Sequence, residues 1–204
     1  MIAIIDYGAG NIRSVSKALA HIGCDSFITR EREKILQADG VILPGVGSFG
    51  DTMDSICSYG IRDTVIEYTK SGKPFLGICL GLQLLFPKSE ESPDASGLGI
   101  FDGSITKIPS GEGLKIPHIG WNSLDIKKSG GLFKGIEKNP YVYFVHSYYL
   151  KAADSAIVSA QTEYGVTIDA AVEQGNVYAT QFHPEKSGET GLKILRNFAD
   201  IVNG

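Results

Sequence analysis

Residues 73–86 read Lys73-Pro74-Phe75-Leu76-Gly77-Ile78-Cys79-Leu80-Gly81-Leu82-Gln83-Leu84-Leu85-Phe86. The first half is a short apolar run typical of a buried strand, and the second half has the apolar spacing of a helix. Cys79 lies between them, flanked by glycines that permit a tight turn. A helix beginning just after Cys79 would place free N–H groups beside its sulfur and favour the thiolate. The pattern predicts a nucleophilic cysteine on a strand-to-helix turn, with a buried structural cysteine as the alternative.

The first 86 residues alternate between short apolar runs and helical patterns. Strands are predicted at residues 2–5, 24–29, 40–43 and 73–78, and helices at 12–22, 31–37 and, with interruptions, 51–70. Asn11 is the predicted N-cap of the first helix, and Asp51 that of the third. This alternation predicts an α/β fold with a mainly parallel central sheet flanked by helices, whose functional residues gather at the carboxyl ends of the strands.

Two glycine-rich loops follow predicted strands. Gly8-Ala9-Gly10 lacks the third glycine of a dinucleotide-binding fingerprint, because position 13 is Arg, so nucleotide binding is not favoured there. Pro44-Gly45-Val46-Gly47 is suited to turning its backbone N–H groups toward a ligand at the end of a strand. The alternative for this second loop is an ordinary flexible turn.

The pattern changes after Phe86. Residues 87–97 are polar and predict a loop. Short strand-type segments follow at residues 103–108, 122–126, 141–144, 156–162, 167–173 and 176–182, and an amphipathic helix is predicted at 188–202. This half predicts an additional antiparallel β portion, and 204 residues fit one domain, 1–204.

The last predicted strand ends in His183-Pro184-Glu185. On an extended segment, side chains two residues apart point to the same side, so His183 and Glu185 would face one site. The carboxylate would orient the imidazole, whose other nitrogen could exchange a proton with a thiol. Alone, the motif also fits a solvated turn, but together with Cys79 it favours a Cys-His-Glu triad.

Composition excludes several other classes of protein. The net charge of -4 argues against a dominant nucleic-acid-binding role. The three cysteines are widely spaced and include no CxxC pair, which favours a reducing cytosol over a disulfide framework or a metal site. The first residues lack the features of a signal peptide, and no apolar run reaches the ~20 residues needed to span a bilayer.

Three segments taken together resemble the class I glutamine amidotransferases: Pro44-Gly45-Val46-Gly47, Gly77-Ile78-Cys79-Leu80-Gly81-Leu82-Gln83 and His183-Pro184-Glu185. They span nearly the whole chain in the family's order, and the resemblance implies a flavodoxin-like fold. A finer resemblance is to the glutaminase subunits of imidazole glycerol phosphate synthases in histidine biosynthesis. It rests on residues 5–12, on Ser48-Phe49, on His118-Ile119-Gly120-Trp121-Asn122, on residues 143–148, and on Lys186-Ser187.

The resemblance implies a role for each matching residue. Cys79 would attack the side-chain amide of glutamine, His183 would carry protons, and Glu185 would orient His183. The oxyanion would be held by N–H groups of Leu80 and of the Val46-Gly47 loop. The substrate contacts implied are Gly47, Gln83, Glu91, Ser147 and Tyr148. The interface or gating positions implied are Asn11, Trp121, Tyr143 and Lys186. No cofactor and no metal are implied.

A partner is also implied, a (β/α)₈-barrel cyclase subunit that forms a heterodimer with this chain and consumes the ammonia. Glutaminase activity would stay weak until the cyclase holds its substrate, with the glycine-rich loop as the switch. Trp121 and Tyr143 could instead be ordinary core or rim aromatics. The alternatives for the chain are the glutaminase partner of pyridoxal phosphate synthase, a stand-alone γ-glutamyl hydrolase, and a non-catalytic module of the same fold.

Overall fold

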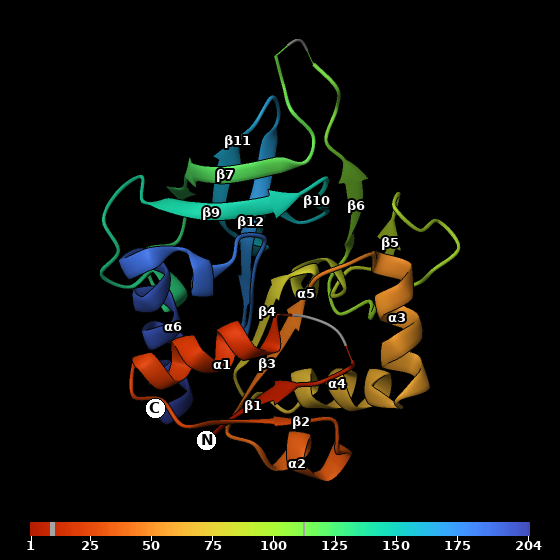
Figure 1. Ribbon diagram of the computed structural model, residues 1–204, viewed down its shortest axis with the longest axis vertical. Coiled ribbons are helices and arrows are strands. Elements are labelled where there is room, and N and C mark those ends of the chain that lie inside the picture. The colour runs from red at the N-terminus through yellow and green to blue at the C-terminus, as the bar shows by residue number, and fades with distance from the viewer. Residues whose placement is uncertain (9–10, 112) are drawn as a thin grey trace.

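The main sheet runs from the lower to the upper part of the molecule (Figure 1). The computed structural model describes residues 1–8, 11–111 and 113–204. Within them the main sheet has eight strands, in the order β2 (Ser26–Thr29), β1 (Ile2–Ile5), β3 (Gly40–Gly45), β4 (Phe75–Cys79), β13 (Val177–Thr180), β12 (Thr167–Gln174), β11 (Val158–Glu163) and β8 (Asp125–Ile126). Pairing is parallel from β2 to β13 and antiparallel beyond it. The predicted fold class is confirmed.

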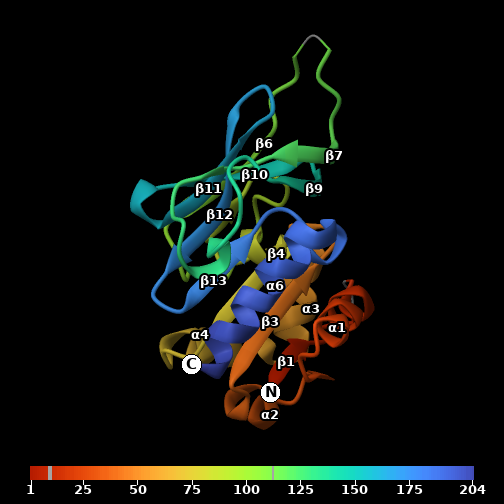
Figure 2. The ribbon, with the colours of Figure 1, turned by 90° about the vertical axis from the view of Figure 1, so that its left-hand side faces the viewer.

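Helices cover both faces of the parallel part, as Figure 2 shows. One face carries α1 (Ile12–His21) and α6 (Gly188–Asn203), and the other carries α2 (Arg32–Gln37), α3 (Phe49–Ser58) and α4 (Ile61–Lys70). The alternation of β1 explains the two layers. Ile2 and Ile4 pack with α1 and α6, whereas Ala3 and Ile5 pack with the other three helices. Strands buried on both faces must be apolar throughout, which is why residues 2–5 are.

Two smaller sheets lie beyond the carboxyl ends of β3 and β4, in the upper part of Figure 1. One joins β10 (Tyr148–Ala152), β6 (Gly103–Lys107) and β5 (Lys88–Ser89), and the other pairs β7 (His118–Ser123) with β9 (Tyr141–His146). Short 3₁₀ turns η1 (Gly131–Phe133), η2 (Ser155–Ile157) and η3 (Pro184–Lys186) complete the chain, with α5 (Leu80–Gln83) after β4. These small sheets therefore cover the edge of the main sheet at which β3 and β4 end.

The structure corrects several predicted elements. The interrupted helix over 51–70 is two helices, because Gly60 adopts a left-handed conformation (φ 67°) between α3 and α4. Ser48, not Asp51, caps α3: its hydroxyl accepts a hydrogen bond from the Asp51 N–H. Strand β10 has no predicted counterpart, and β5 lies within the predicted loop at 87–97. The strand predicted at 122–126 is divided between the end of β7, which begins at His118, and β8.

Some predictions fall on residues that the structure does not describe. Ala9 and Gly10 of the first glycine-rich loop lie outside the described residues, as does Glu112. Among the described helices, none combines the length and apolar character that crossing a bilayer requires.

Candidate active site

Cys79 occupies a strained turn between β4 and α5. Its φ of 56° and ψ of -108° are unusual for a residue with a side chain. Glycines let the neighbouring backbone come close: a Cβ on Gly77 would lie 2.6 Å from the Gly81 carbonyl oxygen, and one on Gly81 would lie 2.0 Å from that of Leu43. A Cβ on Gly45 would lie 2.7 Å from Leu80 Cβ. The tight turn expected from Gly77 and Gly81 is present, and Gly45 lets it form against β3, which the sequence did not predict.

Helix α5 is shorter than predicted. It ends at Gln83 instead of continuing to Phe86. The following carbonyl groups bond elsewhere: Leu84 accepts from the Leu98 N–H and Leu85 from the Ile100 N–H, each at 2.8 Å. Residues 98–101 thus satisfy carbonyl groups that the end of the helix leaves without intrahelical partners.

His183 reaches Cys79 because β13 lies beside β4. Thr180 of β13 pairs with Ile78 of β4, so both strands end at the same edge of the sheet. The Nδ1 atom of His183 lies 2.8 Å from Glu185 Oε1, and both side chains are buried. The expected extended geometry is wrong, however: Pro184–Lys186 form the 3₁₀ turn η3, and this turn brings the carboxylate to the Nδ1 edge of the ring.

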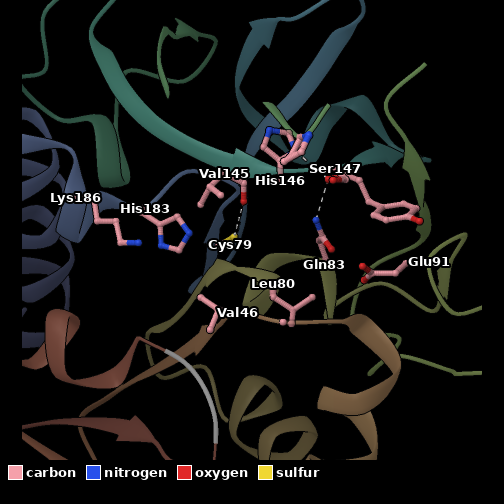
Figure 3. A pocket seen from close by; sticks show the side chains of 13 residues that line it. Val46, Cys79, Leu80, Gln83, Glu91, Val145, His146, Ser147, His183 and Lys186 are labelled. Atoms are coloured by element: carbon pink, nitrogen blue, oxygen red, sulfur yellow. Dashed lines mark hydrogen bonds between the residues drawn. The ribbon is translucent and has the colours of Figure 1, made fainter. Parts of the chain in front are cut away.

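The protonation of His183 depends on these two neighbours. Burial alone disfavours imidazolium, but interaction with Cys79 and then with Glu185 outweighs it and raises the pKa of His183 to about 9. Because a carboxylate can only accept, Nδ1 carries a proton. The Nε2 atom is buried and has no hydrogen-bond partner among the described residues, and the ring lies beside Cys79 (Figure 3). His183 is therefore placed to exchange a proton with the sulfur.

Asn11 holds the carboxylate of this pair. Its Nδ2 donates to Glu185 Oε1 at 3.0 Å. Asn11 occupies the N-cap position of α1, but its side chain does not cap the helix. The predicted N-cap position of Asn11 is confirmed, but its side chain binds Glu185 instead of capping the helix.

A pocket of about 420 Å³ opens over Cys79. It is lined by Val46, Gly47, Cys79, Leu80, Gln83, Glu91, Pro117, Val145, His146, Ser147, Tyr148, His183 and Lys186. Every expected oxyanion and substrate-contact residue belongs to this set, as do Cys79, His183 and Lys186. Glu185 lies behind His183, and Asn11, Trp121 and Tyr143 lie outside the lining. The volume is in the range of small-molecule sites.

Three of the expected substrate-contact residues, Gln83, Tyr148 and Glu91, are held by hydrogen bonds within the protein. Gln83 Nε2 donates to the Tyr148 carbonyl oxygen at 3.0 Å, so its own Oε1 is the acceptor that remains. Glu91 lies on a loop but is anchored, because its Oε2 accepts from the Phe49 N–H at 2.8 Å at the start of α3. This side of the pocket is therefore preorganised for binding a ligand.

Sequence reasoning missed Pro117, Val145 and His146 in the lining. The Val145 carbonyl oxygen lies 3.9 Å from Cys79 Sγ (Figure 3). The His146 ring is buried, and burial lowers the pKa of His146 to about 3. No helix or strand pattern identifies these residues as pocket lining, although residues 143–148 carry the family resemblance. Val145 and His146 reach the pocket through the pairing of β9 with β7, which brings His118 and His146 together.

The rim beside the pocket carries exposed aromatic side chains. Trp121 is 54% exposed and Ile119 59% exposed, both on β7. The Trp121 and Tyr143 rings meet edge to face, with centroids 6.3 Å apart. Lys186 Nζ lies 5.9 Å from the Tyr143 ring centroid. This arrangement connects an apolar surface directly to a residue of the pocket lining, Lys186.

Residues 3–202 match the family described as glutamine amidotransferase class-I. The chain belongs to the class I glutamine amidotransferases. Two solved structures support the fold of this amidotransferase. One, described as a glutamine amidotransferase, superposes with a TM-score of 0.78 at 21% identity and covers 100% of both chains. The other, PurLQS from Thermotoga maritima, gives a TM-score of 0.74 at 22% identity and covers 98% of this chain and 97% of that one.

Curated relatives are much more similar in sequence to this amidotransferase. The imidazole glycerol phosphate synthase subunit HisH of Caldanaerobacter subterraneus subsp. tengcongensis is 51% identical over 202 residues, covering 99% of this chain and 98% of the relative. The subunit of the same name from Methanothermobacter thermautotrophicus is 50% identical over 202 residues, covering 99% of each. The finer resemblance inferred from the motifs is thus confirmed.

Proposed function

We propose that this chain is the glutaminase subunit of an imidazole glycerol phosphate synthase, acting through residues 1–204 as one domain. It would hydrolyse L-glutamine to L-glutamate and ammonia. The observation that carries the proposal is the placement of Cys79, on a strained turn at the floor of a pocket and beside a histidine that Glu185 holds at 2.8 Å. Relatives about half identical over their full length bear the name of that subunit.

The chemistry follows from the protonation states. Cys79 sulfur, its proton transferred to His183, attacks the side-chain amide carbon of glutamine and forms a tetrahedral intermediate. Imidazolium returns the proton to the leaving nitrogen, the C–N bond breaks, and ammonia departs from a thioester. Water then loses a proton to His183 and attacks the thioester carbon; the C–S bond breaks, and glutamate leaves with sulfur restored.

The oxyanion of each intermediate needs donors near the sulfur. Leu80 N–H, at the start of α5, supplies one, and the Val46-Gly47 loop supplies the other. Gly47 has φ 105°, a conformation open to glycine, so this peptide can turn at low cost. Loss of one such donor typically costs ~10²–10³ in rate. The orientation of this loop is therefore a natural control point.

The proposed contacts with glutamine suit its charges. The free Oε1 of Gln83 can accept from the α-ammonium group of the substrate, and the Glu91 carboxylate adds negative charge to the same wall. Ser147, between β9 and β10, and Tyr148, the first residue of β10, can hold the other end of the amino acid, with Gly47 close to it.

The proposed partner is a cyclase subunit with a (β/α)₈ barrel, in a heterodimer. It would use the ammonia to make imidazole glycerol phosphate and aminoimidazole carboxamide ribonucleotide in histidine biosynthesis. The exposed Trp121 and Ile119 are suited to docking such a partner, because large apolar side chains on a surface favour association. Asn11, Tyr143 and Lys186 would respond to docking, since they connect this rim to the triad. Three free cysteines fit a reducing cytosol.

The deciding experiment measures glutamine hydrolysis by the chain alone and with the cyclase subunit and its ribonucleotide ligand. We expect slow turnover alone and an increase by orders of magnitude in the complex. Full activity of the chain alone would indicate a stand-alone γ-glutamyl hydrolase, and none in either condition a non-catalytic module. Cys79→Ala should abolish glutamine use and leave synthesis from added ammonia intact; loss of both would make Cys79 structural.

A further inference from the structure

Gln181 is the one residue, among the side chains that the structure describes around Cys79 Sγ, that donates a hydrogen bond to the sulfur. It follows β13 and is completely buried. Its Nε2 lies 3.7 Å from Cys79 Sγ, and its Oε1 accepts from Gln83 Nε2 at 2.9 Å. A buried amide must be satisfied at both ends, so the side chain has little freedom to move away.

The direction of this amide is fixed from outside the site. The Tyr148 carbonyl can only accept, so the Gln83 atom that faces it at 3.0 Å is the nitrogen. The same nitrogen faces Gln181, which must therefore turn its oxygen toward Gln83. The nitrogen of Gln181 is left to face the sulfur. A rotated amide would place two donors together at Gln83.

The Tyr148 carbonyl is itself held by a chain of imidazoles. His146 Nδ1 lies 2.9 Å from it and must carry a proton, so a neutral His146 presents a lone pair at Nε2. His118 Nδ1 donates to that lone pair at 3.0 Å. Asn122 Nδ2 faces the remaining His118 nitrogen at 3.5 Å. The donors run in one direction, from Asn122 through His118 to His146, and His146 Nδ1 reaches the Tyr148 carbonyl oxygen, which also accepts from Gln83 Nε2.

We propose that Gln181 is a further residue of the active site, which holds the Cys79 sulfur in place and favours its thiolate by N–H donation. The Val145 carbonyl, 3.9 Å from the sulfur, can pair with the thiol but repels the thiolate. The Gln181 amide has the opposite preference, and a hydrogen bond to the charged form favours that form. When the proton moves to His183, the Gln181 N–H remains a donor to the sulfur beside the imidazolium. The inference rests on the proposed role of Cys79 as nucleophile.

The test is the pH dependence of Cys79 alkylation by iodoacetamide, followed by mass spectrometry of its peptide. In Gln181→Met, which keeps the size but not the donor, we expect the profile to move to higher pH. The rate at neutral pH should fall about three- to tenfold, the net value of one ordinary hydrogen bond. Gln181→Glu should slow the reaction more, because a carboxylate repels the thiolate. Exposed Cys57 in the same samples is the internal control, and Gln174→Met, at the exposed end of β12, the matched variant.

A measurement on the unaltered chain covers the case in which both variants fail to fold. The side-chain amide resonance of Gln181 in a ¹⁵N-labelled sample should shift when Cys79 is alkylated, and that of Gln174 should not. Unchanged alkylation profiles in folded variants, or an unmoved Gln181 resonance, would overturn the proposal. Alkylation reads the sulfur and not glutamine turnover, so failure of the glutaminase assay with these results intact would count against the proposed function alone.

Discussion

Asn11 Nδ2 donates to Glu185 Oε1 at 3.0 Å, although the two residues are 174 positions apart in the chain. The same Oε1 accepts from His183 Nδ1 at 2.8 Å. The start of α1 is thereby joined to the turn η3, and the carboxylate that orients the imidazole is held from two sides. In a triad the acid acts by fixing the tautomer and direction of the ring, so what holds the acid also matters for the rate.

Asn11→Ala should lower kcat for glutamine hydrolysis by the complex about tenfold, the rate equivalent of ~1.5 kcal/mol for a hydrogen bond to a charged group. The KM should change little, because Asn11 is absent from the pocket lining. Asn203→Ala, at the exposed end of α6, is the control. An unchanged kcat in Asn11→Ala would mean that Glu185 is held without this bond.

Gly81→Ala should destabilise the protein by about 1–3 kcal/mol or more, the usual cost of overpacking. The added Cβ would lie 2.0 Å from the Leu43 carbonyl oxygen and force β3 and α5 apart. Urea denaturation measures the change. The control is Gly130→Ala, since a Cβ there has no atom within 4 Å and the glycine lacks positive φ. Equal stability of both variants would show that the elbow tolerates a wider separation.

The free energy of unfolding should fall as the pH is lowered from about 6.5 toward 4. Burial lowers the pKa of His118 to about 4 and, with the charges of His118 and His183, that of His146 to about 3. The pKa of an unfolded histidine is ~6.5. As the pH falls from about 6.5 toward 4, the unfolded chain therefore binds protons at these two histidines that the folded chain does not bind. We expect a slope of about 1–2 kcal/mol per pH unit.

Urea denaturation between pH 5 and 6.5, where few carboxyl groups titrate, isolates this contribution. His118→Gln should reduce the slope by about half, because one of the two buried imidazoles is then missing. The same slope in the variant and in the unaltered chain would mean that His118 does not resist protonation.

Stability should also fall at alkaline pH. The pKa of His183 is raised to about 9 in the folded state, so its stabilising contribution is complete below the unfolded value of ~6.5 and is lost as the pH rises through 9. Cys79→Ser removes the larger of the two favourable interactions, and its Tm should begin to fall at lower pH. Cys57→Ser on the surface of α3 should follow the unaltered chain. Identical dependence of Tm on pH in the unaltered chain and both variants would mean that Cys79 does not raise the pKa of His183.

Much of the site was predictable because its main parts are local. Glycines on either side of Cys79 permit a sharp turn from a strand into a helix, so residues 77–81 indicated the elbow, and the His183-Pro184-Glu185 motif favoured it over a buried structural cysteine. The parallel order of β1, β3 and β4 follows from alternation of short apolar runs with helices. The predicted extended His183–Glu185 segment was wrong in conformation and right in outcome, since a 3₁₀ turn also brings the two side chains together.

The rest depends on distant pairings that leave no local pattern. His146 and Val145 reach the pocket because β9 pairs with β7, and the Val145 carbonyl oxygen comes to 3.9 Å from Cys79 Sγ. Gln181 looks like any polar residue after a strand, and its two partners come from 98 and 102 positions away. A sequence pattern records which face of an element is apolar; it does not record which buried polar groups will satisfy each other.

The α/β order, the turn at Cys79 and the presence of a histidine and a carboxylate near it could be inferred from the chain, because backbone sterics and local apolar spacing fix these features. The surroundings of these residues depend on long-range packing. The Asn11 contact to Glu185, the Gln181 contact to the sulfur and the neutral His118–His146 pair arise where strands and turns far apart in the chain meet. Burial there makes every unpaired polar atom costly, and that cost selects the partners.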